Sequence, residues 1–124
     1  MVTGGYRESG SLTSVEVLSA AGTTISCTIP PLPIRRSGHT QDGLLSCGGG
    51  DTTDTSRTCA KFSALAGDWV VSHNLLESRY WHSSWQSPAG LVLIGGGYSY
   101  TTTELLSSSD SSSSSNFTLQ YSTA

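Results

Sequence analysis

Short runs in which apolar and polar residues alternate recur along the chain and predict β-strands. Ile25, Cys27 and Ile29 are separated by threonine and serine, and a similar run spans residues 117–121. A period of two places one set of side chains on a buried face and the other toward solvent. Glycine (14 residues) and serine are abundant, whereas the best helical candidate, residues 74–81, is too short to show a continuing helical period. We therefore predict an all-β fold.

Two independent markers indicate an internal repeat. Three glycine clusters follow apolar residues and end at Gly5, Gly50 and Gly97, which gives periods of 45 and 47 residues when the last glycines are aligned. The pattern Arg-x-x-His begins at Arg36 and again at Arg79, 43 residues later. Because unrelated markers with similar periods rarely arise by chance, we predict that one structural unit is repeated.

The alternation places about four short strands, a to d, in each repeated unit. Unit one (residues 1–34) lacks strand a, whereas unit two (35–77) and unit three (78–124) are complete. The expected strands are b 2–5, c 14–18 and d 23–29 in unit one; a 37–41, b 43–49, c 58–63 and d 68–73 in unit two; and a 80–86, b 91–96, c 102–107 and d 116–122 in unit three.

The constellation of these markers resembles the Kelch repeat over nearly the whole chain. A Gly-Gly doublet ends strand b, an aromatic residue (Trp69) lies in strand d of unit two, and a proline-rich turn leads to Arg-x-x-His. The resemblance implies consecutive four-stranded antiparallel blades of a β-propeller, each of about 50 residues. Closed propellers have about four to eight blades. We therefore expect either a larger propeller completed by further blades or other chains, or association between copies of this chain.

No pattern in the sequence predicts catalysis, a cofactor or a metal site. A Gly-x-Ser-x-Gly motif is absent, and no lysine or helix start follows the glycine clusters as it would in a phosphate-binding loop. His39 and His82 occupy equivalent positions in successive units and should not converge on one metal ion. We interpret both histidines as structural groups that form hydrogen bonds inside blades, and Arg36 and Arg79 as hydrogen-bond hubs within a blade.

Composition excludes two classes of partner. Charged residues make up 12% of the chain, the net charge is −3, and Lys61 is the sole lysine, so there is no basic stripe for nucleic acid. No apolar run approaches the roughly 18 residues of a membrane span. No signal peptide is visible at the N-terminus.

The three cysteines leave alternatives open. Cys47 and Cys59 fall at the end of strand b and the start of strand c in unit two, where antiparallel neighbours can bring them within disulfide reach. Two buried free thiols are the alternative. Cys27 is either a free core thiol or the partner of a cysteine outside this segment.

A glycosylation signal lies near the C-terminal end. Asn116-Phe117-Thr118 is an N-glycosylation sequon, and the preceding serine-rich run (residues 107–115) is either a loop that carries O-linked sugar or a plain linker. Together with the cysteine pair and the low lysine content, the sequon predicts a secreted or cell-surface glycoprotein.

The loops between strands b and c and between strands d and a should emerge on one face, which we call the loop face. Aromatic and arginine residues are common in binding hot spots, and loops on a rigid scaffold often carry function. We predict a non-enzymatic binding scaffold whose loop face binds a protein or a glycan; the alternative is a structural component that self-assembles into oligomers or filaments. The expected loop-face residues are Tyr6, Arg7, Glu8, Asp51, Asp54, Arg57, Tyr98 and Tyr100 from the b–c loops, with Arg35 and Glu77 from the d–a loops.

Overall fold

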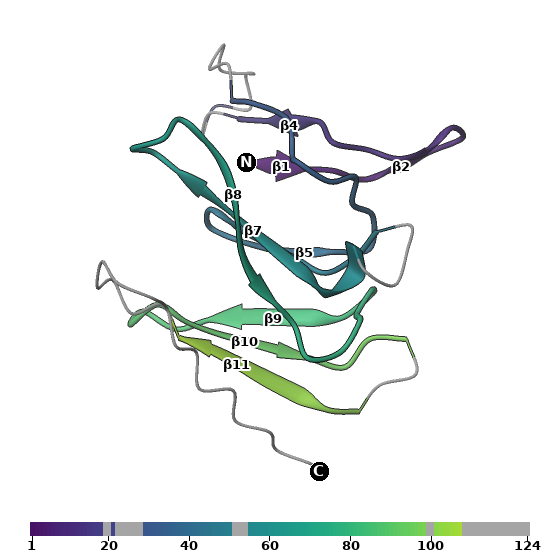
Figure 1. Ribbon diagram of the computed structural model, residues 1–124, viewed down its shortest axis with the longest axis vertical. Coiled ribbons are helices and arrows are strands. Elements are labelled where there is room, and N and C mark those ends of the chain that lie inside the picture. Colours follow the sequence, from purple (N-terminus) through teal and green to yellow (C-terminus); the bar gives the residue numbers. More distant parts are fainter. Residues whose placement is uncertain (19–20, 22–28, 51–54, 99–100, 108–124) are drawn as a thin grey trace.

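The computed structural model describes residues 1–18, 21, 29–50, 55–98 and 101–107 (Figure 1). In this part of the chain, all regular structure is β except one 3₁₀ turn, which confirms the prediction of an all-β fold. The elements are β1 (Val2–Thr3), β2 (Tyr6–Arg7), β3 (Gly10–Ser11), β4 (Val15–Glu16), β5 (Thr40–Asp42), β6 (Leu45–Cys47), η1 (Thr55–Arg57), β7 (Thr58–Ser63), β8 (Asp68–Asn74), β9 (Ser83–Gln86), β10 (Leu91–Gly95) and β11 (Thr103–Ser107).

Unit two contains a four-stranded antiparallel sheet in the order β5-β6-β7-β8. Strands that are consecutive in the sequence are neighbours in the sheet, with short connections from β5 to β6 and from β7 to β8 and a longer one, residues 48–57, from β6 to β7. The four strands predicted for this unit are confirmed, although strand a begins at Thr40, later than expected. The β7–β8 ladder is the longest in the described residues and contains a register shift between Cys59 and Ala60.

Unit three contains a three-stranded antiparallel sheet in the order β11-β10-β9. Strand a was expected from residue 80, but β9 begins at Ser83 because Trp81 has a positive φ of 55°, which is incompatible with a strand. The predicted fourth strand, residues 116–122, lies outside the described residues.

Unit one departs most from expectation. Strands β1 and β4 pair as strands b and c, but each has only two residues, and most of predicted strand d lies outside the described residues. The connection between them, expected to be a loop, forms the β2–β3 hairpin with Tyr6 opposite Ser11. The polar sequence of this hairpin carries no apolar alternation, so its strands gave no signal. Gly10, with φ of 110°, supplies the backbone conformation that closes the turn.

The sheets of the three units follow one another along the long axis of the molecule, as Figure 1 shows from the purple to the green ribbons. Apolar faces meet at both junctions. The junction between units one and two buries Leu32, Ala60 and Trp69, with Met1, Val15, Ile29 and Phe62 packed around them. The junction between units two and three buries Cys47, Cys59, Leu75, Val92, Ile94 and Leu106. Each unit therefore depends on its neighbour to cover its apolar face.

Candidate functional site

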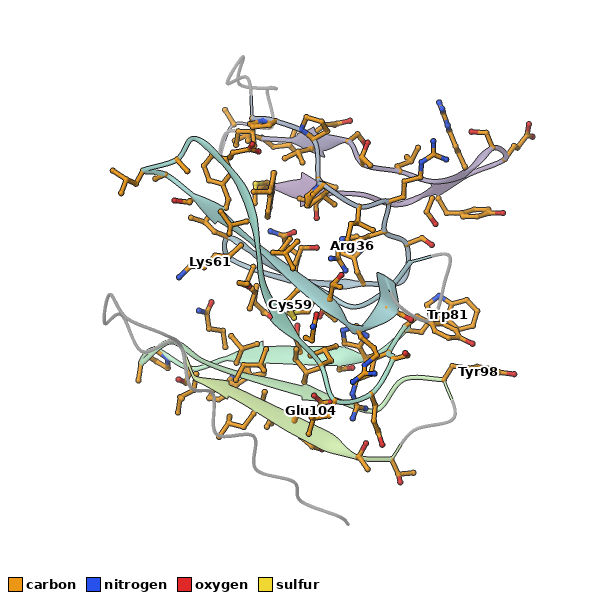
Figure 2. All side chains as sticks on the ribbon, viewed as in Figure 1. Arg36, Cys59, Lys61, Trp81, Tyr98 and Glu104 are labelled. Atoms are coloured by element: carbon orange, nitrogen blue, oxygen red, sulfur yellow. A yellow bond between two sulfur atoms is a disulfide. The ribbon has the colours of Figure 1, made fainter. Side chains whose placement is uncertain are left out.

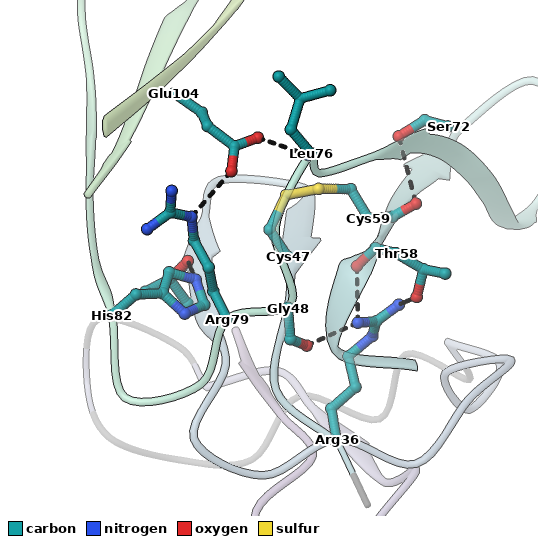
Figure 3. Close-up of a disulfide and its surroundings, with 11 residues drawn as sticks. Arg36, Cys47, Gly48, Thr58, Cys59, Ser72, Leu76, Arg79, His82 and Glu104 are labelled. Atoms are coloured by element: carbon teal, nitrogen blue, oxygen red, sulfur yellow. Dashed lines mark hydrogen bonds and ion pairs between the residues drawn. A yellow bond between two sulfur atoms is a disulfide. The ribbon is translucent and has the colours of Figure 1, made fainter. Parts of the chain in front are cut away.

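A buried arginine holds the loop end of unit two together (Figure 3). Arg36 is fully buried, and its Nη1 donates to the carbonyl oxygens of Gly48 (2.6 Å) and Thr58 (2.8 Å). Its Nη2 donates to Thr58 Oγ1 at 2.6 Å. Burial lowers the pKa of Arg36 to about 10. The predicted hub within unit two is confirmed.

Arg79 repeats this arrangement in unit three. Its Nη1 donates to the carbonyl oxygens of Gly96 (2.7 Å) and Thr102 (3.0 Å), and its Nη2 donates to Thr102 Oγ1 at 2.6 Å. Unit three adds a buried carboxylate, because Arg79 Nε donates to Glu104 at 2.9 Å. Glu104 pairs with Ile94 across the sheet of unit three. The residue at the equivalent position of unit two is Ala60, which pairs with Ser46, so unit two has no carboxylate at this position.

The histidines of the Arg-x-x-His pattern join neighbouring units. His39 Nε2 and the Thr3 hydroxyl of unit one share a hydrogen bond of 3.0 Å, and His82 Nε2 and the Thr40 hydroxyl of unit two share one of 2.8 Å. The expectation that these histidines bond inside their own blades was therefore wrong. Burial, and then the charge of Arg79, lower the pKa of His82 to about 4. Both histidines fit a structural role between units.

Glycines let these junctions close. Gly5 N–H donates to the carbonyl of Arg36, and Gly49 N–H donates to the carbonyl of Arg79. Gly5 and Gly49 therefore hold equivalent positions in units one and two. This corrects the sequence alignment, which had matched Gly5 with Gly50, the last glycine of its cluster. The preceding glycines, Gly4 and Gly48, pack closely against the next unit. An added Cβ at Gly48, for example, would lie 2.6 Å from the Arg79 carbonyl oxygen.

The predicted cysteine pair is confirmed as a disulfide. Cys47 and Cys59 face each other across β6 and β7, with their sulfur atoms 2.09 Å apart (Figure 3). Both residues are buried at the junction with unit three. The disulfide therefore ties the strands that support the arginine hub.

Three aromatic side chains gather at the loop end of unit three. The rings of Tyr80 and Tyr98 are stacked, with centroids 5.4 Å apart and planes inclined by 18°. Trp81 meets both rings edge to face, at 5.3 Å from Tyr80 and 6.2 Å from Tyr98. We call these three residues the aromatic cluster. Figure 2 shows Trp81 and Tyr98 on the same side of the molecule.

The aromatic cluster is fixed by the backbone and yet exposed to solvent. Trp81 N–H donates to the Gly38 carbonyl (2.7 Å), and Tyr98 N–H donates to the Tyr80 carbonyl (3.1 Å). Even so, Trp81 is 73% exposed and Tyr98 is 58% exposed. Rigid, exposed aromatic rings are suited to stacking against a ligand. The ring distances leave no space for a cation between the rings, so the outer surface of the cluster is the part that can bind.

Sequence reasoning named Tyr98 but missed Tyr80 and Trp81. A signal was present, because these two residues fill the variable positions of Arg-x-x-His, where unit two has Ser37 and Gly38. Gly38 has φ of 62° and Trp81 has φ of 55°, so the repeat requires a left-handed residue at this position. Unit three places a bulky side chain there, at a cost of about 1–2 kcal/mol.

The other predicted loop-face residues are not all on one site. Tyr6 (73% exposed) and Arg7 lie on the exposed β2–β3 hairpin. Arg57 is exposed in η1, and its Nε donates to the Leu75 carbonyl at 3.1 Å. Glu77 accepts a hydrogen bond from Arg79 and so contributes to the hub. Glu8 and Arg35 are also exposed. The other loop-face candidates, Asp51, Asp54 and Tyr100, lie outside the described residues, as do Cys27 and the sequon residue Asn116.

Within the described ranges, no three histidine, cysteine or acidic side chains are grouped so that they could hold a metal ion. No helix among these residues is long and apolar enough to cross a bilayer. A scan against protein-family models matches no part of the chain, and a search of curated proteins finds none similar to it.

Proposed function

We propose that the chain is a non-enzymatic binding scaffold built from Kelch-like propeller units in an extracellular protein, and that its loop face binds a protein or a glycan. The aromatic cluster carries this proposal. The side chains of Trp81 and Tyr98 are exposed, but the cluster is held by backbone hydrogen bonds and by mutual stacking, so little conformational entropy is lost when a ligand binds. The Cys47–Cys59 disulfide supports an oxidising compartment.

Backbone strain at Trp81 supports the same function. A left-handed conformation is a genuine outlier for a bulky residue, and such outliers gather at functional sites. Glycine would satisfy the backbone at this position, as Gly38 does in unit two. The indole therefore serves a purpose that the fold itself does not require.

The experiment screens the full chain against a panel of defined oligosaccharides and synthetic peptides, and then tests variants of the aromatic cluster. Trp81→Gly and Tyr98→Ala should each abolish binding, since both remove a ring and leave the arginine hubs intact. Trp85→Ala is the matched control, because Trp85 is also exposed (60%) but lies on β9, outside the aromatic cluster. Binding that survives both cluster variants, or is equally lost in Trp85→Ala, contradicts the proposal.

A second candidate function, self-assembly, is favoured by the outer face of unit three. Leu93 of β10 pairs with Trp85 of β9 on one side and with Leu105 of β11 on the other. These three side chains lie on the outer face of the sheet, because the neighbours of Leu93 along β10, Val92 and Ile94, are buried on the inner face. Trp85 and Leu93 are both exposed, at 60% and 40%. A second copy would cover this apolar surface, in an oligomer or a filament.

Sedimentation at increasing protein concentration tests self-assembly. Assembly should raise the mean mass with concentration, and Leu93→Lys should keep the chain monomeric because it places a charge in the apolar contact. A wild-type chain that stays monomeric at high concentration contradicts this second function.

A further inference from the structure

A polar cavity of about 300 Å³ lies beside the β2–β3 hairpin. It is open to solvent, and no acidic residue is among the described residues that line it. Two arginines, three residues with hydroxyl side chains and one leucine line it: Arg7, Arg35, Ser9, Ser11, Thr13 and Leu12. Sequence reasoning placed both arginines on the loop face but did not bring them to one cavity.

Backbone pairing fixes the two walls of this cavity. Arg7 lies on β2 opposite Gly10 of β3. The segment that carries Arg35 runs beside the end of the hairpin, because Arg36 N–H donates to the Leu12 carbonyl (3.0 Å) and Leu32 N–H donates to the Thr13 carbonyl (2.8 Å). Arg36 is itself buried and held in the hub, so the backbone position of its neighbour Arg35 is set by the same contacts.

The two arginines of the cavity carry charges that no described carboxylate neutralises. The chain carries a net charge of −3, yet Arg7 and Arg35 form no ion pair among the residues that the structure describes. Two arginines that line one space, with no acidic residue in its described lining, form a favourable site for an anion, because each guanidinium group can donate two parallel hydrogen bonds to a carboxylate or sulfate.

We propose that this cavity binds the anionic group, a sulfate or a carboxylate, of an acidic oligosaccharide that also contacts the aromatic cluster. The inference rests on the proposed binding function and names its ligand class. The two places are close to each other in the fold: Ser11, which lines the cavity, has its Oγ 2.7 Å from Ser37 Oγ, and the next residue, Gly38, packs against Trp81.

The surroundings favour a saccharide over a peptide. A sugar ring presents C–H groups on its face, which stack on aromatic rings, and hydroxyl groups at its edge. Ser9 and Thr13 offer hydroxyl groups that both donate and accept hydrogen bonds, as sugar hydroxyls require. The aromatic cluster and the cavity thus match the two kinds of surface of an acidic sugar chain.

The experiment titrates the full chain by calorimetry with three oligosaccharides of equal length: one sulfated, one bearing uronate groups and one neutral. At least one acidic probe should bind about tenfold more tightly than the neutral one, and its binding should weaken as salt is raised. The sulfated and uronate arms identify which anion is preferred. A peptide rich in aspartate, of similar charge, tests the competing ligand class.

Arg7→Gln and Arg35→Gln should each weaken binding of the acidic probe about tenfold, because each removes charge-assisted hydrogen bonds. Lys61→Gln is the matched control: it changes the net charge by the same amount, and Figure 2 shows Lys61 on the opposite side of the molecule from Trp81. Both arginines are exposed, so the variants should unfold at the wild-type temperature.

The outcomes separate this inference from the proposed function. Equal affinity for neutral and acidic probes, or wild-type binding by both arginine variants, overturns the anion site, whereas loss of binding in Trp81→Gly would still uphold the aromatic cluster. Tighter binding of the aspartate peptide overturns the saccharide. An equal loss in Lys61→Gln shows attraction by net charge alone, and overturns the site as well. If no probe of any kind binds, both proposals fail.

Discussion

Replacing Gly48 with alanine should destabilise the fold far more than the same replacement at Gly96. The two glycines hold equivalent backbone positions, with φ of 65° and 70°, and each carbonyl accepts a hydrogen bond from the arginine of its hub. Their surroundings differ. An added Cβ at Gly48 would lie 2.5 Å from His82 Cε1 and 2.6 Å from the Arg79 carbonyl oxygen. At Gly96, no atom of the described residues lies within 4 Å of that Cβ.

The comparison isolates packing between units. Both substitutions impose a left-handed conformation on alanine, which costs about 1–2 kcal/mol. Only Gly48→Ala must also displace the backbone of the next unit, and overpacking of this kind costs about 1–3 kcal/mol more. We therefore expect losses in the free energy of unfolding of about 1–2 kcal/mol for Gly96→Ala and about 2–5 kcal/mol for Gly48→Ala.

Urea unfolding followed by tryptophan fluorescence measures both losses, and equal slopes against urea show that the two variants unfold the same surface. Gly4→Ala provides a second test, because its Cβ would lie 2.5 Å from the Arg36 carbonyl oxygen and so should resemble Gly48→Ala. Equal losses for Gly48→Ala and Gly96→Ala would refute the reasoning, since unit three would then not pack on Gly48 as described.

Four further predictions concern stability. Reducing the Cys47–Cys59 disulfide should lower the free energy of unfolding by roughly 2–3 kcal/mol, because its 12-residue loop is released; urea midpoints with and without reductant measure this. Glu104→Gln should cost roughly 1.5–3 kcal/mol in the same assay, since it removes the fully buried carboxylate of the Arg79 hub and leaves only the ion pair with Glu77. The pKa of His82 falls from 6.5 to about 4 on folding, so the unfolded chain binds the proton more readily and stability should fall as the pH drops from 6.5 to about 4; His82→Gln should flatten this dependence. Trp81→Gly should be more stable to urea than Trp81→Ala by about 1 kcal/mol, because only glycine adopts a φ of 55° without strain.

The strands of unit two were predictable because local pattern and tertiary structure agree there. The alternation around Phe62 and Trp69 places both rings on one face of the β7–β8 pair, where they pack edge to face at 5.6 Å. The cysteine pair was predictable for the same reason, since the expected strands already set Cys47 beside Cys59.

Other features could not be read from local sequence because they depend on contacts between units. The partners of His39 and His82 lie 36 and 42 residues away, so no spacing within one unit identifies them. The burial of Glu104 could have been predicted, because Glu104 lies two residues before Leu106 and so shares a strand face with it. A carboxylate at a buried position requires a buried partner. That partner is Arg79.

Comparison of units two and three distinguishes residues that the fold requires from residues that it does not require. Arginine recurs because each hub needs the same hydrogen bonds within its own unit, whereas histidine and glycine recur because each unit forms the same contacts with its neighbour. At the left-handed position between arginine and histidine, unit two has Gly38 and unit three has Trp81. Stacking in the aromatic cluster contributes about 0.5–1.5 kcal/mol per ring pair, enough to offset the strain at Trp81. It does not offset the exposure of 73% of that side chain to water. A fold that needed only stability would keep glycine here, and this difference between the units is the reason for the binding role that we propose for the aromatic cluster.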